Sequence, residues 1–390
     1  MRQDATVMGL VGLAHATSHF SHLLLPPLFP VFMREFGLSY SDVGLLMTLF
    51  FVVSGVGQAL SGFLVDRVGA RPVLFGALTL FTASAAIASM AQGYGWLLVS
   101  ALLAGLGNAP FHPVDFSILN QRVSPARLGH AFSVHGLTGN LGWALAPVFL
   151  VGLSALADWR QAYQAAVVLY VAVIGVLLWQ RGRLKTEAVA HTQGDSSRVN
   201  ASFLRLPVVW WCFAFFMLST MTLAVVQTYS TSILQAVHGV SLEAATVTLT
   251  AYMLCGAIGM LVGGFVAAKS RQVDRVVAWA MGTGAALMLL AATGWMGAWG
   301  SMAILAATGF ALGIGGPSRD MMIRKATPKG ATGRVYGTVY SGLDVGFALS
   351  PLIFGFLMDG SWYAVTLAGA AVTLLLSVYA AVGVGRRLQH

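Results

Sequence analysis

The chain has 390 residues, of which 57% are hydrophobic and only 9% are charged. A soluble domain carries about 25% charged residues, so this composition excludes a soluble enzyme, a disordered chain and a coiled coil. The net charge of +9 does not indicate a nucleic-acid partner, because the basic residues lie in short segments between apolar stretches. The two cysteines lie inside apolar stretches and predict neither a disulfide framework nor a cysteine-based metal site.

Twelve apolar stretches are long enough, at about 20 residues each, to cross a lipid bilayer as helices. The predicted spans are residues 6–33, 43–65, 72–92, 96–120, 128–153, 161–180, 206–234, 243–268, 275–294, 299–322, 332–357 and 362–384. We therefore predict an all-α polytopic membrane protein with 12 transmembrane helices, surrounded by the lipid bilayer.

Lysine and arginine are distributed unevenly between the two sides of the membrane that these spans define. With the N-terminus in the cytoplasm, 19 of the 22 basic residues fall on cytoplasmic segments. Arg34 and Arg160 fall on the far side, and Arg319 lies inside a span. The positive-inside rule then predicts a multi-pass inner-membrane protein with both termini in the cytoplasm.

The longest polar stretch, residues 181–205, separates six spans in residues 1–180 from six spans in residues 206–390. We expect it to be a flexible cytoplasmic linker. The two halves are similar in sequence, because residues 129–134 and 140–147 correspond to residues 333–338 and 344–351. This repeat predicts two pseudo-symmetric six-helix bundles, an arrangement that many transporters share.

A short charged turn, GFLVDRVGAR at residues 62–71, follows the second predicted span. Its acid and bases can latch helix ends together by charge-assisted hydrogen bonds, and its glycine permits close helix packing. With the repeated halves, this motif makes the whole chain resemble the major facilitator superfamily (MFS). The motif residues are Gly62, Asp66, Arg67 and Arg71, and the departure from the family pattern is at Ala70.

The resemblance implies the MFS fold, transport by alternating access, a monomer, no cofactor and no enzymatic activity. Two further segments resemble the fosmidomycin-resistance-type subgroup of this family. They are Phe111-His112-Pro113 in the fourth span and Ser21-His22-Leu23-Leu24 in the first. In that subgroup an acid usually follows the Phe-His-Pro directly, whereas here Val114 precedes Asp115.

The first span carries three histidines, His15, His19 and His22, within about a 60° sector of one helix face. Ionisable groups at membrane depth are costly and indicate function, so we predict that all three bind substrate or protons. Imidazole also suits transition metals, which makes the same three residues an alternative metal site. The remaining alternative is neutral histidines that hydrogen bond between packed helices.

The fourth span carries a polar stripe, because Asn108, His112 and Asp115 follow at spacings of four and three residues. We predict that Asn108 and His112 bind substrate and that Asp115 couples transport to protons. The structural alternative for Asp115 is an ion pair with Arg122 or Arg127. Proline next to His112 predicts a local break in the helix.

Arg319 in the tenth span occupies the position that the repeat relates to Asp115. Its rigid fork of donors suits a carboxylate or phosphonate, so we predict that it binds an anionic substrate. The structural alternative is an ion pair with Asp115 or Asp320. Adjacent helical residues point about 100° apart, which makes Asp320 a poor direct partner.

Asp344 in the eleventh span replaces Asn140 of the first half. A carboxyl group at that depth can carry a proton, so Asp344 is the second predicted proton-coupling residue. The structural alternative is a hydrogen bond to Tyr336, Tyr340 or a histidine. The remaining predicted substrate contacts are Asn140, Gln227 and Tyr340.

These features together predict a proton-coupled secondary transporter for a small hydrophilic solute, most simply an organic anion such as a carboxylate or phosphonate. The first alternative is a transporter of transition metals or metal chelates that uses the first-span histidines. The second is a drug/proton antiporter. A membrane-embedded enzyme or a receptor is less favoured, because neither class is expected to combine repeated halves with a charged latch turn.

Overall fold

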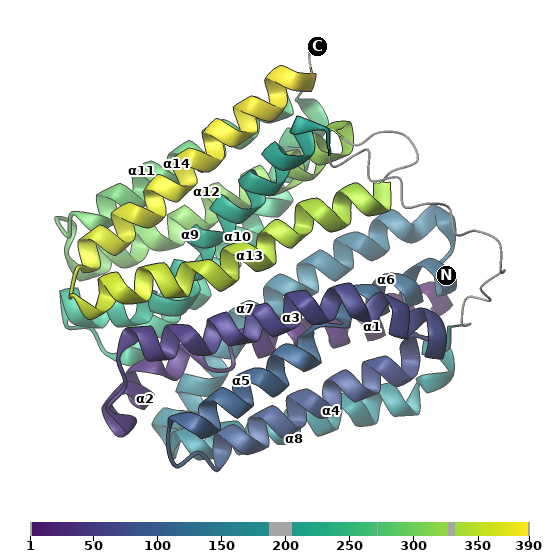
Figure 1. Ribbon diagram of the computed structural model, residues 1–390, viewed down its shortest axis with the longest axis horizontal. Coiled ribbons are helices and arrows are strands. Elements are labelled where there is room, and N and C mark those ends of the chain that lie inside the picture. Colours follow the sequence, from purple (N-terminus) through teal and green to yellow (C-terminus); the bar gives the residue numbers. More distant parts are fainter. Residues whose placement is uncertain (1, 187–204, 271, 327–331, 389–390) are drawn as a thin grey trace. The chain divides into compact units, whose positions relative to one another are not determined.

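A computed structural model describes residues 2–186, 205–270, 272–326 and 332–388 of the chain, and these residues form helices and turns without a β-strand. Most of the predicted linker, residues 187–204, lies outside the described part. The chain divides into two compact units. Unit 1 comprises Met1–Leu38 and Leu45–His191, and unit 2 comprises Ser39–Gly44 and Thr192–His390. Within each unit, the helices lie alongside one another as a bundle (Figure 1).

Unit 1 contains most of α3, the whole of seven further α-helices and three short 3-10 helices. They are α1 (Arg2–His22), η1 (Pro26–Leu28), α2 (Phe29–Phe36), α3 (Tyr40–Val68), α4 (Ala70–Ser89), α5 (Tyr94–Asn108), α6 (Phe111–Arg122), η2 (Pro125–Arg127), α7 (Leu128–Leu156), α8 (Trp159–Trp179) and η3 (Arg181–Leu184). The first residues of α3 are grouped with unit 2.

Unit 2 contains the remaining helices. They are α9 (Pro207–His238), α10 (Leu242–Lys269), α11 (Val273–Ala292), α12 (Gly297–Ala326), α13 (Thr332–Asp359) and α14 (Tyr363–Leu388). Local sequence fixes the ends of α9 in particular. Pro207 occupies the first turn, where a missing N–H costs nothing, and Gly239 ends the helix with a left-handed φ of 65°.

Eleven helical segments in the described part of the chain are long and apolar enough to cross a membrane. Helix α1 is not among them, because its sequence is rich in polar residues. Those side chains turn inward: His15, Ser18 and Ser21 are each only 2% exposed. The all-α prediction is confirmed, and α1 buries polar side chains alongside apolar ones such as Val7, Val11 and Ala14, which are 0% exposed.

Two predicted spans are broken where proline interrupts the helix. Residues 6–33 form α1, η1 and α2 rather than one helix, with the break just before Pro26 and Pro27. The fourth span breaks at Ala109–Pro110, between α5 and α6. The prediction of a break at His112–Pro113 is therefore wrong by three residues. Pro113 lies in the first turn of α6, where proline is tolerated.

Glycine lets particular helix pairs approach closely. A side-chain carbon added at Gly142 of α7 would collide with the carbonyl oxygen of Ala16 in α1. In unit 2, the same change at Gly309 of α12 would collide with the carbonyl oxygen of Tyr252 in α10. Small residues at such crossings are characteristic of helix packing in membranes. The α1–α7 contact matters for function, because it brings the α1 histidines against α7.

Candidate functional site

The buried carboxylate of Asp115 in α6 is the centre of a polar cluster inside unit 1. Asp115 is 0% exposed, and its Oδ2 lies 2.9 Å from Nδ1 of His15 in α1 and 3.1 Å from Nε2 of His135 in α7. An ionised carboxylate oxygen accepts both hydrogen bonds when each of these nitrogens carries its hydrogen. Three helices are therefore joined through one oxygen atom.

Two further contacts extend this cluster through the imidazole rings. The rings of His15 and His135 stack with their centroids 3.4 Å apart. The ring of His112 lies 5.7 Å from that of His15, and its Nδ1 is 2.8 Å from Oε1 of Gln58 in α3. The amide oxygen of Gln58 can only accept, so His112 Nδ1 donates and its Nε2 holds a lone pair when the ring is neutral.

Asn108, the last residue of α5, is the centre of a second hydrogen-bond network. Its Oδ1 accepts from Ser18 Oγ at 2.6 Å and from His22 Nε2 at 2.9 Å. Its Nδ2 donates to Ser54 Oγ in α3 at 2.7 Å. A single amide thus joins α1, α3 and α5, which the predicted polar stripe of the fourth span did not specify.

The hydrogen bonds of His22 determine its tautomer. Trp143 Nε1 lies 3.2 Å from His22 Nδ1. An indole N–H can only donate, so His22 Nδ1 must accept, and Nε2 must carry the hydrogen donated to Asn108. Both nitrogens of His22 are occupied by protein partners, which makes it a positioning residue within this network.

The alternative metal site was predicted from His15, His19 and His22. In the structure, a different set of possible ligands comes together. The described residues that bring three ligand atoms within 4.8 Å of one another are His15, Asp115 and His135. The prediction from one helix face was incomplete, because ligands converge across helices as well as along one helix.

His19 lies between the two networks. Its ring is 4.4 Å from that of His15, 4.9 Å from that of His22 and 4.2 Å from that of Trp143. Its Nδ1 is buried and makes no hydrogen bond within the described part of the chain. Gly139 of α7 faces it, and an added side-chain carbon there would lie 2.8 Å from this nitrogen. His19 therefore fills the space that Gly139 leaves open.

His135 and Trp143 are the site residues that the sequence analysis did not select. A signal was present in the spacing of α7, because His135, Gly139 and Gly142 recur at intervals of four and three residues. Gly139 and Gly142 both face α1, so a histidine in register with them points toward the α1 histidines.

The predicted structural alternative for Asp115 is wrong. Arg122 donates to the carbonyl oxygens of Gly182 and Arg183 instead. Arg127 pairs with Asp4, 3.3 Å away. The hydrogen bond from Ser124, together with the charge of Arg127, lowers the pKa of Asp4 below its usual value. Both arginines lie at the end of unit 1 that holds the α6–α7 turn, whereas Asp115 is deeper within α6.

In unit 2, Arg319 of α12 is held by two contacts. Its Nε donates to Oδ1 of Asp320 at 2.9 Å, and its guanidinium carbon lies 5.0 Å above the ring of Phe216. The expectation that Asp320 is a poor partner is wrong, because the arginine side chain is long enough for its Nε to reach the carboxylate of the neighbouring residue. The ring of Tyr340 packs 5.0 Å from that of Phe216, so Tyr340 belongs to the same group.

The other predicted residues do not converge on these groups. Asn140 donates to the carbonyl oxygen of Gly136 within its own helix, at 3.0 Å. Gln227 is buried in α9, and its Nε2 has no partner among the described residues. Asp344 is half-buried in α13. The structure does not describe the side chain of Tyr336, which the sequence suggested as a partner of Asp344.

The predicted latch is not closed within the described residues. Asp66 and Arg67 are exposed, and none of the described ion pairs includes either of them or Arg71. Gly62 has open space where a side chain would extend. The turn is instead held by a hydrogen bond from the N–H of Ala70 to Thr186 Oγ1, 2.8 Å long.

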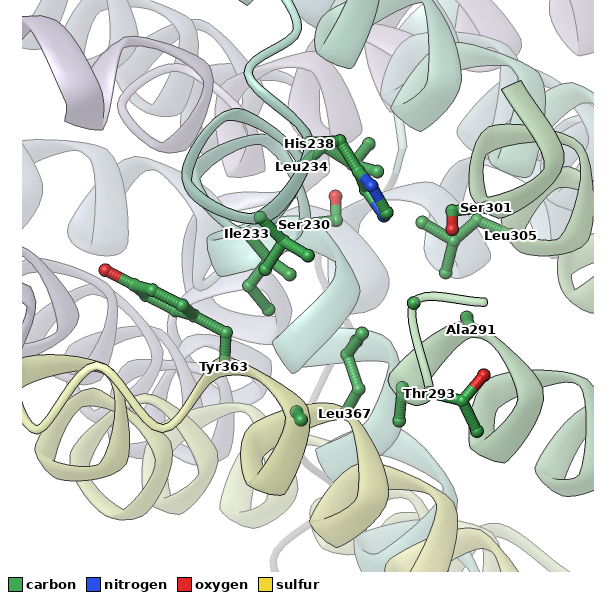
Figure 2. A pocket seen from close by; sticks show the side chains of 14 residues that line it. Ser230, Ile233, Leu234, His238, Ala291, Thr293, Ser301, Leu305, Tyr363 and Leu367 are labelled. Carbon is green, nitrogen blue, oxygen red and sulfur yellow. The ribbon is translucent and has the colours of Figure 1, made fainter. Parts of the chain in front are cut away.

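Unit 2 also contains a cavity of about 180 Å³ among α9, α11, α12 and α14. Its polar lining includes Ser230, His238 and Ser301, and Figure 2 shows Ser301 across the space from Ser230 and His238. The other lining residues are mainly apolar, and none of the predicted site residues borders it. The cavity is therefore separate from the polar cluster around Asp115 and from the group around Arg319.

Comparison with known proteins relates this architecture to one family. The family model described as Major Facilitator Superfamily matches residues 11–316 and 249–388. These two overlapping matches include every site residue named above.

Two curated relatives illustrate the range of proteins that this chain is similar to. The chain is 24% identical over 247 residues to the probable L-galactonate transporter of Escherichia coli K12, covering 60% of this chain and 54% of that protein. It is 24% identical over 278 residues to the fosmidomycin resistance protein of the same organism, covering 69% and 66%. The chain thus spans about half to two thirds of the length of these relatives.

A solved structure extends the likeness to the fold of the whole chain. The structure is a bacterial homologue of the human lysosomal transporter Spinster in an inward-facing, occupied conformation. It matches with a TM-score of 0.74 and 16% identity, covering 98% of this chain and 96% of the other. Identity this low supports the shared fold alone.

Proposed function

Because the chain belongs to the Major Facilitator Superfamily, we propose that it is a proton-coupled secondary transporter of a small organic anion. The family consists of transporters rather than enzymes. We further propose that residues 1–180 and 206–390 act as two six-helix bundles joined by the linker 181–205. In this proposal the chain works as a monomer in the inner membrane, with both termini in the cytoplasm.

The observation that carries the anion proposal is the position of Arg319. Its contact with Asp320 uses Nε, and Phe216 supports one face of the guanidinium. A planar fork with its orientation fixed in this way suits bidentate binding of a carboxylate or phosphonate. The similarity to the probable L-galactonate transporter supports a carboxylate.

Asp344 is the proposed proton carrier, with Asp115 as a second candidate. Asp344 is half-buried in a helix that meets the length and composition criteria for a membrane span. Ionisable residues at such positions are expensive to keep and mark transport pathways. The corresponding residue of the first half is Asn140, which cannot take up or release a proton. In this proposal, only the second half therefore carries a proton at this position.

The proposal is tested by uptake into liposomes that contain the purified chain, under an imposed inward proton gradient. We expect accumulation of a labelled sugar-acid carboxylate such as L-galactonate. Arg319→Lys should raise KM at least about tenfold, because a point charge does not reproduce the fork. Arg387→Lys is the matched control, because Arg387 also lies over an aromatic ring, that of Trp211, at 4.8 Å.

Uptake that is the same in Arg319→Lys and Arg387→Lys would remove Arg319 from the anion site. The anion proposal as a whole would be contradicted if the proton gradient drives transport of no member of a panel of carboxylates and phosphonates. An occluded dye in the same vesicles verifies that they are sealed.

The similarity to the fosmidomycin resistance protein favours a second candidate, outward transport of a phosphonate in exchange for protons. The motif resemblance in α1 and α6 points in the same direction. Vesicles loaded with fosmidomycin distinguish the two candidates. Gradient-driven release of fosmidomycin without uptake of carboxylates would support the drug antiporter.

A further inference from the structure

His15, Asp115 and His135 present donor atoms suited to a metal ion, independently of any transported anion. The three side chains come from α1, α6 and α7, and they are 2%, 0% and 7% exposed. One ligand atom from each lies within 4.8 Å of the other two. We propose that these three residues bind a divalent transition-metal ion, for which Zn²⁺ is the best match.

The spacing of the donor atoms is close to what a tetrahedral ion requires. Zn²⁺ binds nitrogen and oxygen at roughly 2.0–2.2 Å, which places neighbouring ligand atoms about 3.3 Å apart. The distances from Asp115 Oδ2 to the nitrogens of His15 and His135 are 2.9 Å and 3.1 Å. Because the rings of His15 and His135 stack 3.4 Å apart, both must turn so that their in-plane lone pairs point at one ion.

The chemistry of the donor set favours transition metals. Two imidazoles and one carboxylate suit Zn²⁺ and its neighbours, whereas Mg²⁺ and Ca²⁺ prefer oxygen ligands throughout. His15 would bind through Nδ1 and His135 through Nε2. Each ring supplies the required lone pair by keeping its hydrogen on the other nitrogen. Three protein ligands leave a fourth position for water or an anion.

An unpartnered atom provides a second, independent observation. Asp115 Oδ1 is buried and makes no hydrogen bond within the described part of the chain. Buried polar atoms are normally paired, and a fully buried carboxylate with one bare oxygen is costly. An ion bound beside Oδ2 would balance the charge of Asp115, and Oδ1 could join the coordination or hold a metal-bound water.

Two histidines beside the group are further sources of a nitrogen ligand: His19, whose ring lies 4.4 Å from that of His15 and whose buried Nδ1 makes no hydrogen bond within the described part of the chain, and His112. The ring of His112 lies 5.7 Å from that of His15 and 6.2 Å from that of His135. The hydrogen bond between its Nδ1 and Gln58 leaves the lone pair on Nε2. His22 is excluded from the site, since Trp143 and Asn108 occupy both of its nitrogens.

The test is metal binding by the full-length chain, purified in detergent with a histidine-free tag and treated with a chelator. Zn²⁺ is titrated by calorimetry, and Co²⁺ is used as a probe because its visible absorption reports tetrahedral coordination. We expect one ion per chain and a Zn²⁺-dependent increase in Tm. His135→Ala and Asp115→Asn should each weaken binding by at least about tenfold.

His130→Ala is the matched control, because His130 lies on the same helix but is exposed. Equal Zn²⁺ affinity in His135→Ala and the wild type, or absence of binding to the folded wild type, would overturn the proposal. If Asp115→Asn does not fold, as judged by size-exclusion chromatography, His135→Gln provides the same test. Binding is measured without transport, so failure of the anion proposal and failure of the metal proposal are separate results.

Discussion

At the scale of single residues, Asn108 shows how one amide can determine the state of its neighbours. It accepts from Ser18 and His22 and donates to Ser54. With Trp143 on the other side of the ring, this network holds His22 in one neutral tautomer. Both ring nitrogens of His22 are engaged by protein partners, so His22 helps to position the end of α1.

We expect Asn108→Leu to lower the free energy of unfolding by about 3 kcal/mol or more. The reason is that three hydrogen bonds, each worth about 1 kcal/mol, are lost and their partners stay buried. Thermal unfolding in detergent measures the effect. Asn140→Leu is the control, because its described bond is to its own helix, and it should cost less than about 1 kcal/mol. Equal losses in the two variants would contradict the central role of Asn108.

At the scale of helices, α1 packs closely against α7 at two glycines of α7. Gly139 leaves space for the rings of His15 and His19, and Gly142 lets the backbones meet at Ala16. Close approach is therefore what allows His15 and His135 to share one carboxylate oxygen. Packing and site geometry depend on the same face of α7.

We expect Gly142→Ala to destabilise unit 1 by about 1–3 kcal/mol, because α1 and α7 must separate to admit the methyl group. It should also weaken any Zn²⁺ binding, since the ligands lie on both helices. Gly136→Ala is the matched control on α7, where an added carbon meets nothing within 4 Å. That substitution should be neutral or stabilising by up to about 1 kcal/mol. A lower Tm for Gly136→Ala than for Gly142→Ala would refute this account of the crossing.

At the scale of the whole molecule, the two halves are related in sequence but carry different chemistry. Unit 1 concentrates histidines around Asp115, whereas unit 2 has Arg319 at the related position. Likewise, the first half has Asn140 where the second half has Asp344. The shared helical framework of the two halves therefore carries different side chains at related positions.

We expect Asp344→Asn to abolish accumulation of the anion under a proton gradient while leaving counterflow measurable, because an amide cannot carry the proton. Liposome uptake and counterflow with the same labelled carboxylate measure the two activities. Asp274→Asn, at the start of α11, is the control and should accumulate normally. Loss of counterflow together with accumulation in a folded Asp344→Asn protein would assign Asp344 to substrate binding or structure instead.

The sequence by itself determined the class of protein, the helical fold and the family resemblance, because span length, low charge and repeated motifs are local properties of the chain. It also selected Asp115 and the three α1 histidines, since charge within an apolar stretch is visible without coordinates. Only the tertiary structure decided which of them meet. The partners of Asp115 lie 100 and 20 residues away in the chain, and the His22 tautomer depends on Trp143, 121 residues away. Such contacts depend on how close the helices lie and how they are rotated, and the periodicity of one helix specifies neither.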